Sequence, residues 1–173
     1  MHKKILYIGL IAALLFGSNA AFAASKSLSV PVAGTFTDSH GGTGTFTGQF
    51  AITQFVVSGG QAAAKGLLSG TLIDSTGAVI GSILKSVTIP VTVDPTSTCQ
   101  ILHLDIGPIS LNLLGLQVNL SEIVLDISAQ SGPGNLLGNL LCAVANLLNG
   151  GSFSVNTLVD LLNQILQALL NLI

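Results

Sequence analysis

The segment T-G-T-F-T-G-Q-F-A-I at residues 43–52 decides the fold class. Every second position is glycine or apolar, and the positions between are mostly threonine or glutamine. One face of this pattern carries Gly44, Phe46, Gly48, Phe50 and Ile52. A period of two residues is typical of a β-strand that buries one face. Glycines inside such a strand let neighbouring backbones approach closely, which favours a curved sheet.

The same texture extends on both sides of this segment. Turn signals rich in Asp, Ser and Gly occur at 38–42, 58–60 and 74–77, and they separate expected strands at 27–37, 43–57, 61–73 and 78–93. Alternation continues through residues 99–129, with Gly107-Pro108 and Gly115 marking bends. The apolar positions there are Leu102, Leu104, Ile106, Leu116, Val118, Leu120, Ile123, Leu125 and Ile127.

The period becomes helical after Gly132-Pro133-Gly134. Leucines recur every three or four residues at about 135–149 and 155–173, and asparagines line the opposite stripe together with Cys142. Asn135 is the expected N-cap of the first helix, and Leu136 belongs to its expected apolar face. We therefore expect an α+β fold: a curved antiparallel sheet of about eight strands, as a sandwich or small barrel, with a C-terminal amphipathic helical hairpin packed on it.

The second helix is expected to pack on its own sheet. Leu162 and Leu166 lie on its apolar face, so aspartate at either position should bury an unpaired charge. Asn163 lies on its polar stripe, so Asn163→Asp is expected to be nearly neutral.

The first 24 residues predict export. Lys3 and Lys4 precede an apolar run at 5–16, and Ala21-Phe22-Ala23 resembles a cleavage site. This pattern is typical of a signal peptide at 1–24, which leaves a single secreted domain at 25–173 in the periplasm or outside the cell. Export implies an oxidising compartment, so Cys99 and Cys142 are expected to form a disulfide.

Charge is scarce throughout the chain. Charged residues make up 7% of the sequence, against about 25% in ordinary globular domains. After removal of the leader, three lysines face seven acids, which gives a net charge of −4. This composition argues against nucleic-acid binding, which needs clustered basic residues. No transmembrane segment is expected in the mature chain, because the last helix carries a polar stripe.

His103 and Asp105 share one strand face, and Asp126 or Glu122 could lie on the same face of the sheet. A His–Asp pair can orient a general base, whereas the alternative is an ordinary solvated outer face, which the pattern favours. His40 and His103 could together hold a metal only with further ligands, and no ligand spacing supports such a site. We expect no catalytic residue, no metal and no cofactor.

Two segments carry a resemblance. C-Q-I-L-H-L-D-I-G-P starts at Cys99 and its block runs on to Val118, and G-P-G-N-L-L-G-N-L-L-C-A-V-A covers 132–145. Together they resemble a recurring block of a family of exported bacterial proteins whose function is uncharacterised. The resemblance implies bacterial export and the paired cysteines, and it carries no catalytic residue.

Three function classes follow from these patterns. The first is a non-catalytic protein that binds an apolar small molecule or a protein partner. The second is a structural, self-associating protein of the envelope or extracellular matrix, since a nearly uncharged surface gives little repulsion between copies. The third, a hydrolase built on His103 and Asp105, is the least favoured.

Overall fold

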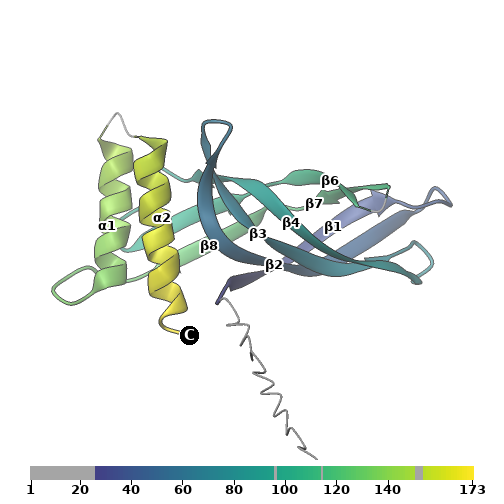
Figure 1. Ribbon diagram of the computed structural model, residues 1–173, viewed down its shortest axis with the longest axis horizontal. Helices are drawn as coiled ribbons and strands as arrows, with labels where there is room; N and C mark the ends of the chain where they lie inside the picture. Colours follow the sequence, from purple (N-terminus) through teal and green to yellow (C-terminus); the bar gives the residue numbers. More distant parts are fainter. Residues whose placement is uncertain (1–25, 96, 114, 151–153) are drawn as a thin grey trace, which may run out of the picture.

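The computed structural model describes residues 26–95, 97–113, 115–150 and 154–173, so the expected leader lies outside the described residues. Eight antiparallel strands are followed by two helices, which stand side by side at one end of the sheet (Figure 1). The expected α+β fold is confirmed. The elements are β1 Leu28–Thr37, β2 Thr43–Ser58, β3 Gln61–Ile73, β4 Val79–Val93, β5 Ile101–Ile106, β6 Ile109–Leu113, β7 Leu116–Leu120, β8 Ile123–Ser128, α1 Leu136–Asn149 and α2 Val155–Leu170.

The strand order is β6-β7-β1-β2-β3-β4-β5-β8. The end strands β6 and β8 do not pair with each other, so the sheet is not closed into a barrel and the expected barrel alternative is wrong. The first four strands form a meander, and inward-facing phenylalanines from β1 and β2 fill its concave side. Phe46 and Phe50 are completely buried there.

The last four strands are one long hairpin with a bend. The pairing runs in a single register from Ile101↔Ser128 to Leu113↔Leu116. Between β5 and β6 the chain turns at Gly107-Pro108, and the buried positions change there from even to odd numbers. Because of this change of face, β5 pairs with β4 on one side of the bend, and β7 pairs with β1 on the other side. The hairpin thus draws the two sides of the meander together without closing the sheet.

Two seams remain where the hairpin diverges from its neighbours. β4 pairs with β5 only over Val91–Val93, which leaves a gap between the rest of β4 and β6. We call this gap the arm seam. Lys85 crosses it, and its Nζ donates to the carbonyl oxygen of Asn112 at 3.3 Å. The second gap, the helix seam, lies between β8 and the first residues of β1, because β1 pairs with β7 only from Gly34 onward.

α2 fills the helix seam. Leu28 of β1 and Leu125 of β8 line one small void together with leucines of α2. The void measures about 10 Å³, so side chains fill this space almost completely. The buried face of α2 consists of Leu158, Val159, Leu162, Ile165, Leu166 and Leu170. The expectation that α2 packs on its own sheet is confirmed.

α1 packs on α2 and is tied to the sheet by a disulfide. Cys99, in the loop before β5, is bonded to Cys142 of α1, as expected. One turn earlier, the side chain of Asn139 accepts from the backbone N–H of Gly132 and donates to its carbonyl oxygen, both at 3.0 Å. A Cβ atom at Gly138 would collide with the carbonyl of Gln130. The asparagine stripe of α1 therefore lies partly against the preceding loop.

The start of α1 departs from the expectation at one residue. Asn135 is the N-cap residue, as expected, although its side chain makes no capping hydrogen bond. Leu136 is 64% exposed, because the first turn of the helix projects beyond the surface that covers the rest of its apolar face.

Asn163 of α2 corrects a further expectation. Its Oδ1 accepts from the backbone N–H of Phe55 at 2.7 Å, and its Nδ2 donates to the carbonyl of Phe55 at 2.9 Å. The first residue of β1, Leu28, lies opposite Ile52, so the part of β2 that follows Ile52 has no β1 residue beside it. The side-chain amide of Asn163 makes the two hydrogen bonds with Phe55 that a neighbouring strand would otherwise make. The sequence pattern missed this role because Asn163 lies on a stripe that is otherwise polar and largely exposed.

Asn163→Asp is expected to destabilise the fold by about 1–3 kcal/mol, because a carboxylate cannot donate to the Phe55 carbonyl and leaves that group unpaired. Chemical unfolding of the purified protein measures this loss. Asn156→Asp, at an exposed position near the start of the same helix, is the matched control and should change stability by less than about 0.5 kcal/mol. Equal unfolding midpoints for the two variants would show that the Asn163–Phe55 pair contributes nothing.

Candidate functional site

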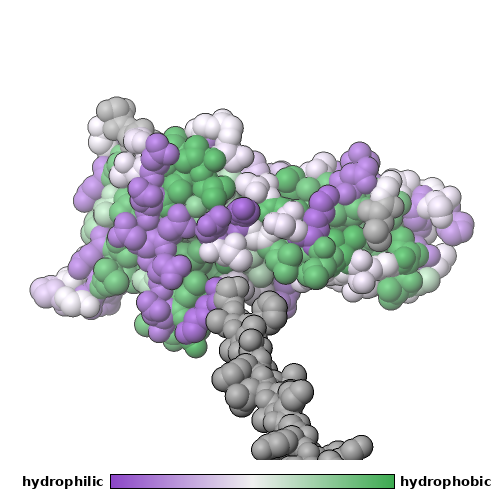
Figure 2. Space-filling view, in the orientation of Figure 1, coloured by the Kyte–Doolittle hydropathy of each residue, from purple (hydrophilic) through white to green (hydrophobic). Residues whose placement is uncertain are grey.

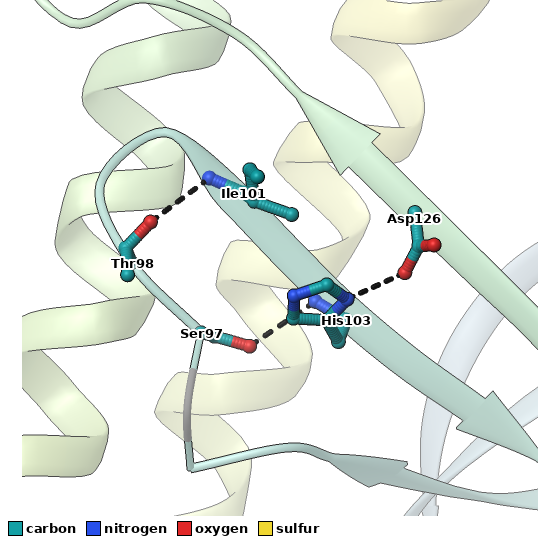
Figure 3. Close-up of polar contacts among 5 residues, drawn as sticks. All are labelled: Ser97, Thr98, Ile101, His103 and Asp126. Carbon is teal, nitrogen blue, oxygen red and sulfur yellow. Dashed lines mark hydrogen bonds and ion pairs between the residues drawn. The ribbon is translucent and has the colours of Figure 1, made fainter.

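His103 and Asp126 form the pair that the sequence singled out. They lie directly opposite each other on β5 and β8, and the imidazole Nδ1 is 2.5 Å from the carboxylate Oδ1 (Figure 3). Both side chains are open to solvent, with exposed fractions of 36% and 60%. Directly opposed side chains that interact in this way are a common form of cross-strand stabilisation. An exposed pair of this kind contributes little to stability.

The nearest hydroxyl groups serve the backbone. The hydroxyl of Ser97, a buried residue, accepts the backbone N–H of His103 at 3.1 Å, and that of Thr98 accepts the N–H of Ile101 at 3.2 Å (Figure 3). These bonds fix the loop before β5 to the first residues of the strand. Ser97 is therefore a structural residue of this loop, oriented toward a peptide group.

Asp105 lies on the same face, two residues along β5 and opposite Val124. Asp126 can hold the imidazole with Nδ1–H toward the carboxylate, which would leave Nε2 available as a general base. Among the residues that the structure describes, no hydroxyl or thiol hydrogen-bonds to this imidazole. Within the described residues, the imidazole thus has an orienting carboxylate and no hydroxyl or thiol bonded to it.

The histidines that could have shared a metal lie in different parts of the fold. His40 lies in the turn between β1 and β2, whereas His103 lies in β5 next to the helices. Within the described ranges no group of three or more His, Cys, Asp or Glu side chains is arranged to hold a metal ion.

Asp38 is a buried carboxylate that the sequence pattern did not single out. Its oxygens accept the backbone N–H groups of His40 and Gly42 within its own turn, and both the N–H and the hydroxyl of Ser75 in the turn between β3 and β4. The hydrogen bond from the Ser75 hydroxyl is the main reason that the pKa of Asp38 lies far below its ordinary value. Asp38 therefore ties together two turns at the end of the sheet distant from the helices.

Asp74 has a similar but local role. Its carboxylate accepts the hydroxyl and the N–H of Thr76 and the N–H of Ala78, and these bonds lower its pKa. The turn at 74–77 is thus closed by hydrogen bonds within its own segment.

Four large apolar side chains of β3 and β4 are exposed, and we call them the β3–β4 patch. Leu67 is 40% exposed, Val79 68%, Ile80 46% and Leu84 72%. Leu84 is opposite Ser69, two residues from Leu67, so these two leucines are diagonal neighbours. The sequence carries a signal for this exposure in the apolar pairs Leu67-Leu68 and Ile83-Leu84. Successive residues of a strand face opposite sides, so one member of each pair must face outward.

A groove of about 530 Å³ lies between the first turn of α1 and the last turn of α2. Leu136, Leu137, Ala168 and Leu172 form its apolar wall, and amide side chains including Asn135 and Asn171 line its rim. No helix in the described segments is long and apolar enough to cross a membrane.

A scan against protein-family models, a search of curated proteins and a search of solved structures each gave no match. The resemblance of residues 99–118 and 132–145 to exported bacterial proteins therefore stays a prediction.

Asp38→Asn is expected to lower the melting temperature most at neutral pH. The lowered pKa means that folding favours the ionised carboxylate, so this stabilisation is present above the unfolded pKa of 3.8 and is lost as the pH falls toward the folded value. The difference in melting temperature between the wild-type protein and the variant should therefore shrink below about pH 4. Ser39→Ala, an exposed residue of the same turn, is the control. A difference that does not change with pH would contradict the role of the charge.

Proposed function

We propose that this chain is an exported, non-catalytic protein that self-associates through the β3–β4 patch. The exposure of four large apolar side chains on two neighbouring strands is the observation that carries the proposal. Isolated apolar residues are common on protein surfaces, but several large ones exposed on neighbouring strands favour an interaction site. Hydrophobic areas on the arm of the sheet that extends away from the helices are visible in Figure 2.

The charge distribution favours a second copy of the chain as the partner. Lys85, next to Leu84, has its ammonium group engaged with Asn112 across the arm seam. The side chains opposite the outer positions of β4 are mainly hydroxyl-bearing or apolar, such as Ser69 and Thr71. Two such surfaces can meet around a twofold axis without electrostatic repulsion. Lys65, two residues from Leu67 on β3, is the other lysine near this surface, so a highly acidic partner would gain little complementary charge there.

The edge of β4 adds to this surface. Beyond the three residues that pair with β5, β4 has no second strand neighbour in the described part of the chain. The carbonyl of Pro90 accepts the N–H of Gly107, which shows that even-numbered residues of β4 direct their backbone groups toward this edge. Exposed backbone groups of this kind can accept a strand from another molecule.

The other function classes receive less support. The His103–Asp126 pair lacks an adjacent nucleophile among the described residues, which disfavours a hydrolase. The space between α2 and the sheet leaves no room for an apolar ligand, because the void there measures about 10 Å³. The groove between the helix ends, at about 530 Å³, is a second candidate function, the binding of an apolar small molecule.

The test is the concentration dependence of the molar mass, measured by light scattering after size exclusion. The wild-type protein should move from monomer to a larger species as its concentration rises. The double variant Val79→Asn, Leu84→Asn should stay monomeric with an unchanged melting temperature, because both side chains are already exposed. Thr88→Asn, an exposed outward position farther along β4, is the control and should associate like the wild-type protein.

A wild-type protein that stays monomeric at its highest soluble concentration would refute self-association. If native mass spectrometry then found a lipid bound to the monomer, and Ala168→Trp displaced it, the groove would become the better assignment.

A further inference from the structure

A polar hollow at the ends of β1, β2 and β7 has no part in the proposed self-association. We propose that this hollow, the threonine notch, binds a neutral, hydroxyl-rich ligand such as a saccharide unit. It measures about 410 Å³, within the range of roughly 300–1,000 Å³ that ligand pockets occupy. Its polar side chains are Thr35, Thr37, Thr43, Gln117 and Asn119.

The notch exists because two paired strands separate. β1 and β7 pair over three positions, which end at Phe36↔Val118, and the hollow opens beyond that point. Gly34 lets the strands come close before they diverge, since a Cβ atom there would lie 2.6 Å from the carbonyl oxygen of Asn119. Gly44 makes room for the ring of Phe36, which a Cβ atom at position 44 would strike. The shape of the hollow is therefore set by close backbone packing.

The polar groups of the notch are available to a ligand. The three threonines and Gln117 make no side-chain hydrogen bond to any described residue. Asn119 accepts the hydroxyl of Ser110 on its Oδ1 at 2.6 Å, which orients the amide and leaves its Nδ2 as a donor. Threonine hydroxyls and amides both donate and accept. These side chains therefore match sugar hydroxyls, which also donate and accept hydrogen bonds.

The absence of charge in the lining defines the ligand class. No acidic or basic side chain lines the notch among the described residues. Asp38 follows Thr37 in the sequence, but its carboxylate is occupied by four hydrogen bonds in the two turns. A charged ligand would lose its hydration without gaining a counter-ion. A neutral ligand avoids this cost.

The base of the notch complements the polar rim. Leu116 is half-buried there and Phe36 lies beneath, so the hollow has an apolar floor below its hydroxyl and amide groups. A sugar ring likewise presents C–H groups on its faces and hydroxyls around its edge. Threonines on neighbouring strands are also stiff at χ1, so a ligand would find these groups already ordered.

The first experiment is an NMR titration of the ¹⁵N-labelled protein with uncharged trisaccharides of glucose and of N-acetylglucosamine. A parallel pull-down tests retention of the protein on an insoluble β-glucan. Amide shifts should be confined to the strand ends around Thr37, Thr43 and Gln117. Thr37→Val and Thr43→Val keep the shape of the side chain and remove its hydroxyl, so each should weaken binding by roughly two- to tenfold. Thr47→Val, on the same face of β2 but outside the notch, should leave binding unchanged.

Binding to the soluble trisaccharides would identify a free saccharide as sufficient, whereas retention on the glucan alone would identify a polymer surface. No shift and no retention at millimolar sugar concentrations would overturn the proposal. Equal losses in Thr43→Val and Thr47→Val would do so as well. Tighter, salt-sensitive binding of a sulfated trisaccharide would contradict the assignment to neutral ligands.

Discussion

The structure depends on one constraint: a curved sheet that does not close must have its apolar interior covered from elsewhere. The bent hairpin of β5–β8 holds both sides of the meander but leaves the helix seam open, and α2 fills that seam with its leucine face. Polar contacts complete the arrangement. Asn163 replaces the missing neighbour of β2 at Phe55, and Lys26 donates to the carbonyl of Leu170 at 3.1 Å, where a positive charge is favoured at a helix C-terminus. The helices are therefore part of the core of the sheet.

This arrangement gives structural roles to the polar, glycine and cysteine residues around α1. In G-P-G-N-L-L-G-N-L-L-C, Gly138 allows close packing on Gln130, Asn139 pairs with the backbone of Gly132, and Cys142 anchors the helix to the loop before β5. Ser97 and Thr98 hold that same loop. The polar and cysteine contacts of residues 97–99 and 138–142 therefore hold the structure together. The two proposed interaction sites, the β3–β4 patch and the threonine notch, lie on strands that the helices do not cover.

The fold could be predicted largely from the sequence, and the reason is periodicity. Alternation around Phe46 and Phe50, and the change of period after Gly134, are local signals that fix the strands and helices within a few residues. The closure of the sheet is a different matter, because it depends on how the hairpin diverges from β4 and β1, which no local pattern encodes. Asn163 and Asp38 were missed for the same reason: their partners, Phe55 and Ser75, lie 108 and 37 residues away. His103 and Asp126 were placed on one face correctly, yet a shared face does not assemble a catalytic site.

Native-state hydrogen exchange tests most directly the claim that α2 and the sheet form one unit. The amide of Phe55, bonded to Asn163, and amides in the middle of α2, such as Ile165, should exchange with the same free energy of opening as Phe46 and Phe50 in the centre of the sheet. That free energy should equal the global free energy of unfolding, and all four amides should respond equally to low concentrations of denaturant. Exchange of α2 and Phe55 through a smaller opening, with the centre of the sheet still protected, would contradict the account and make the helices a separable cover.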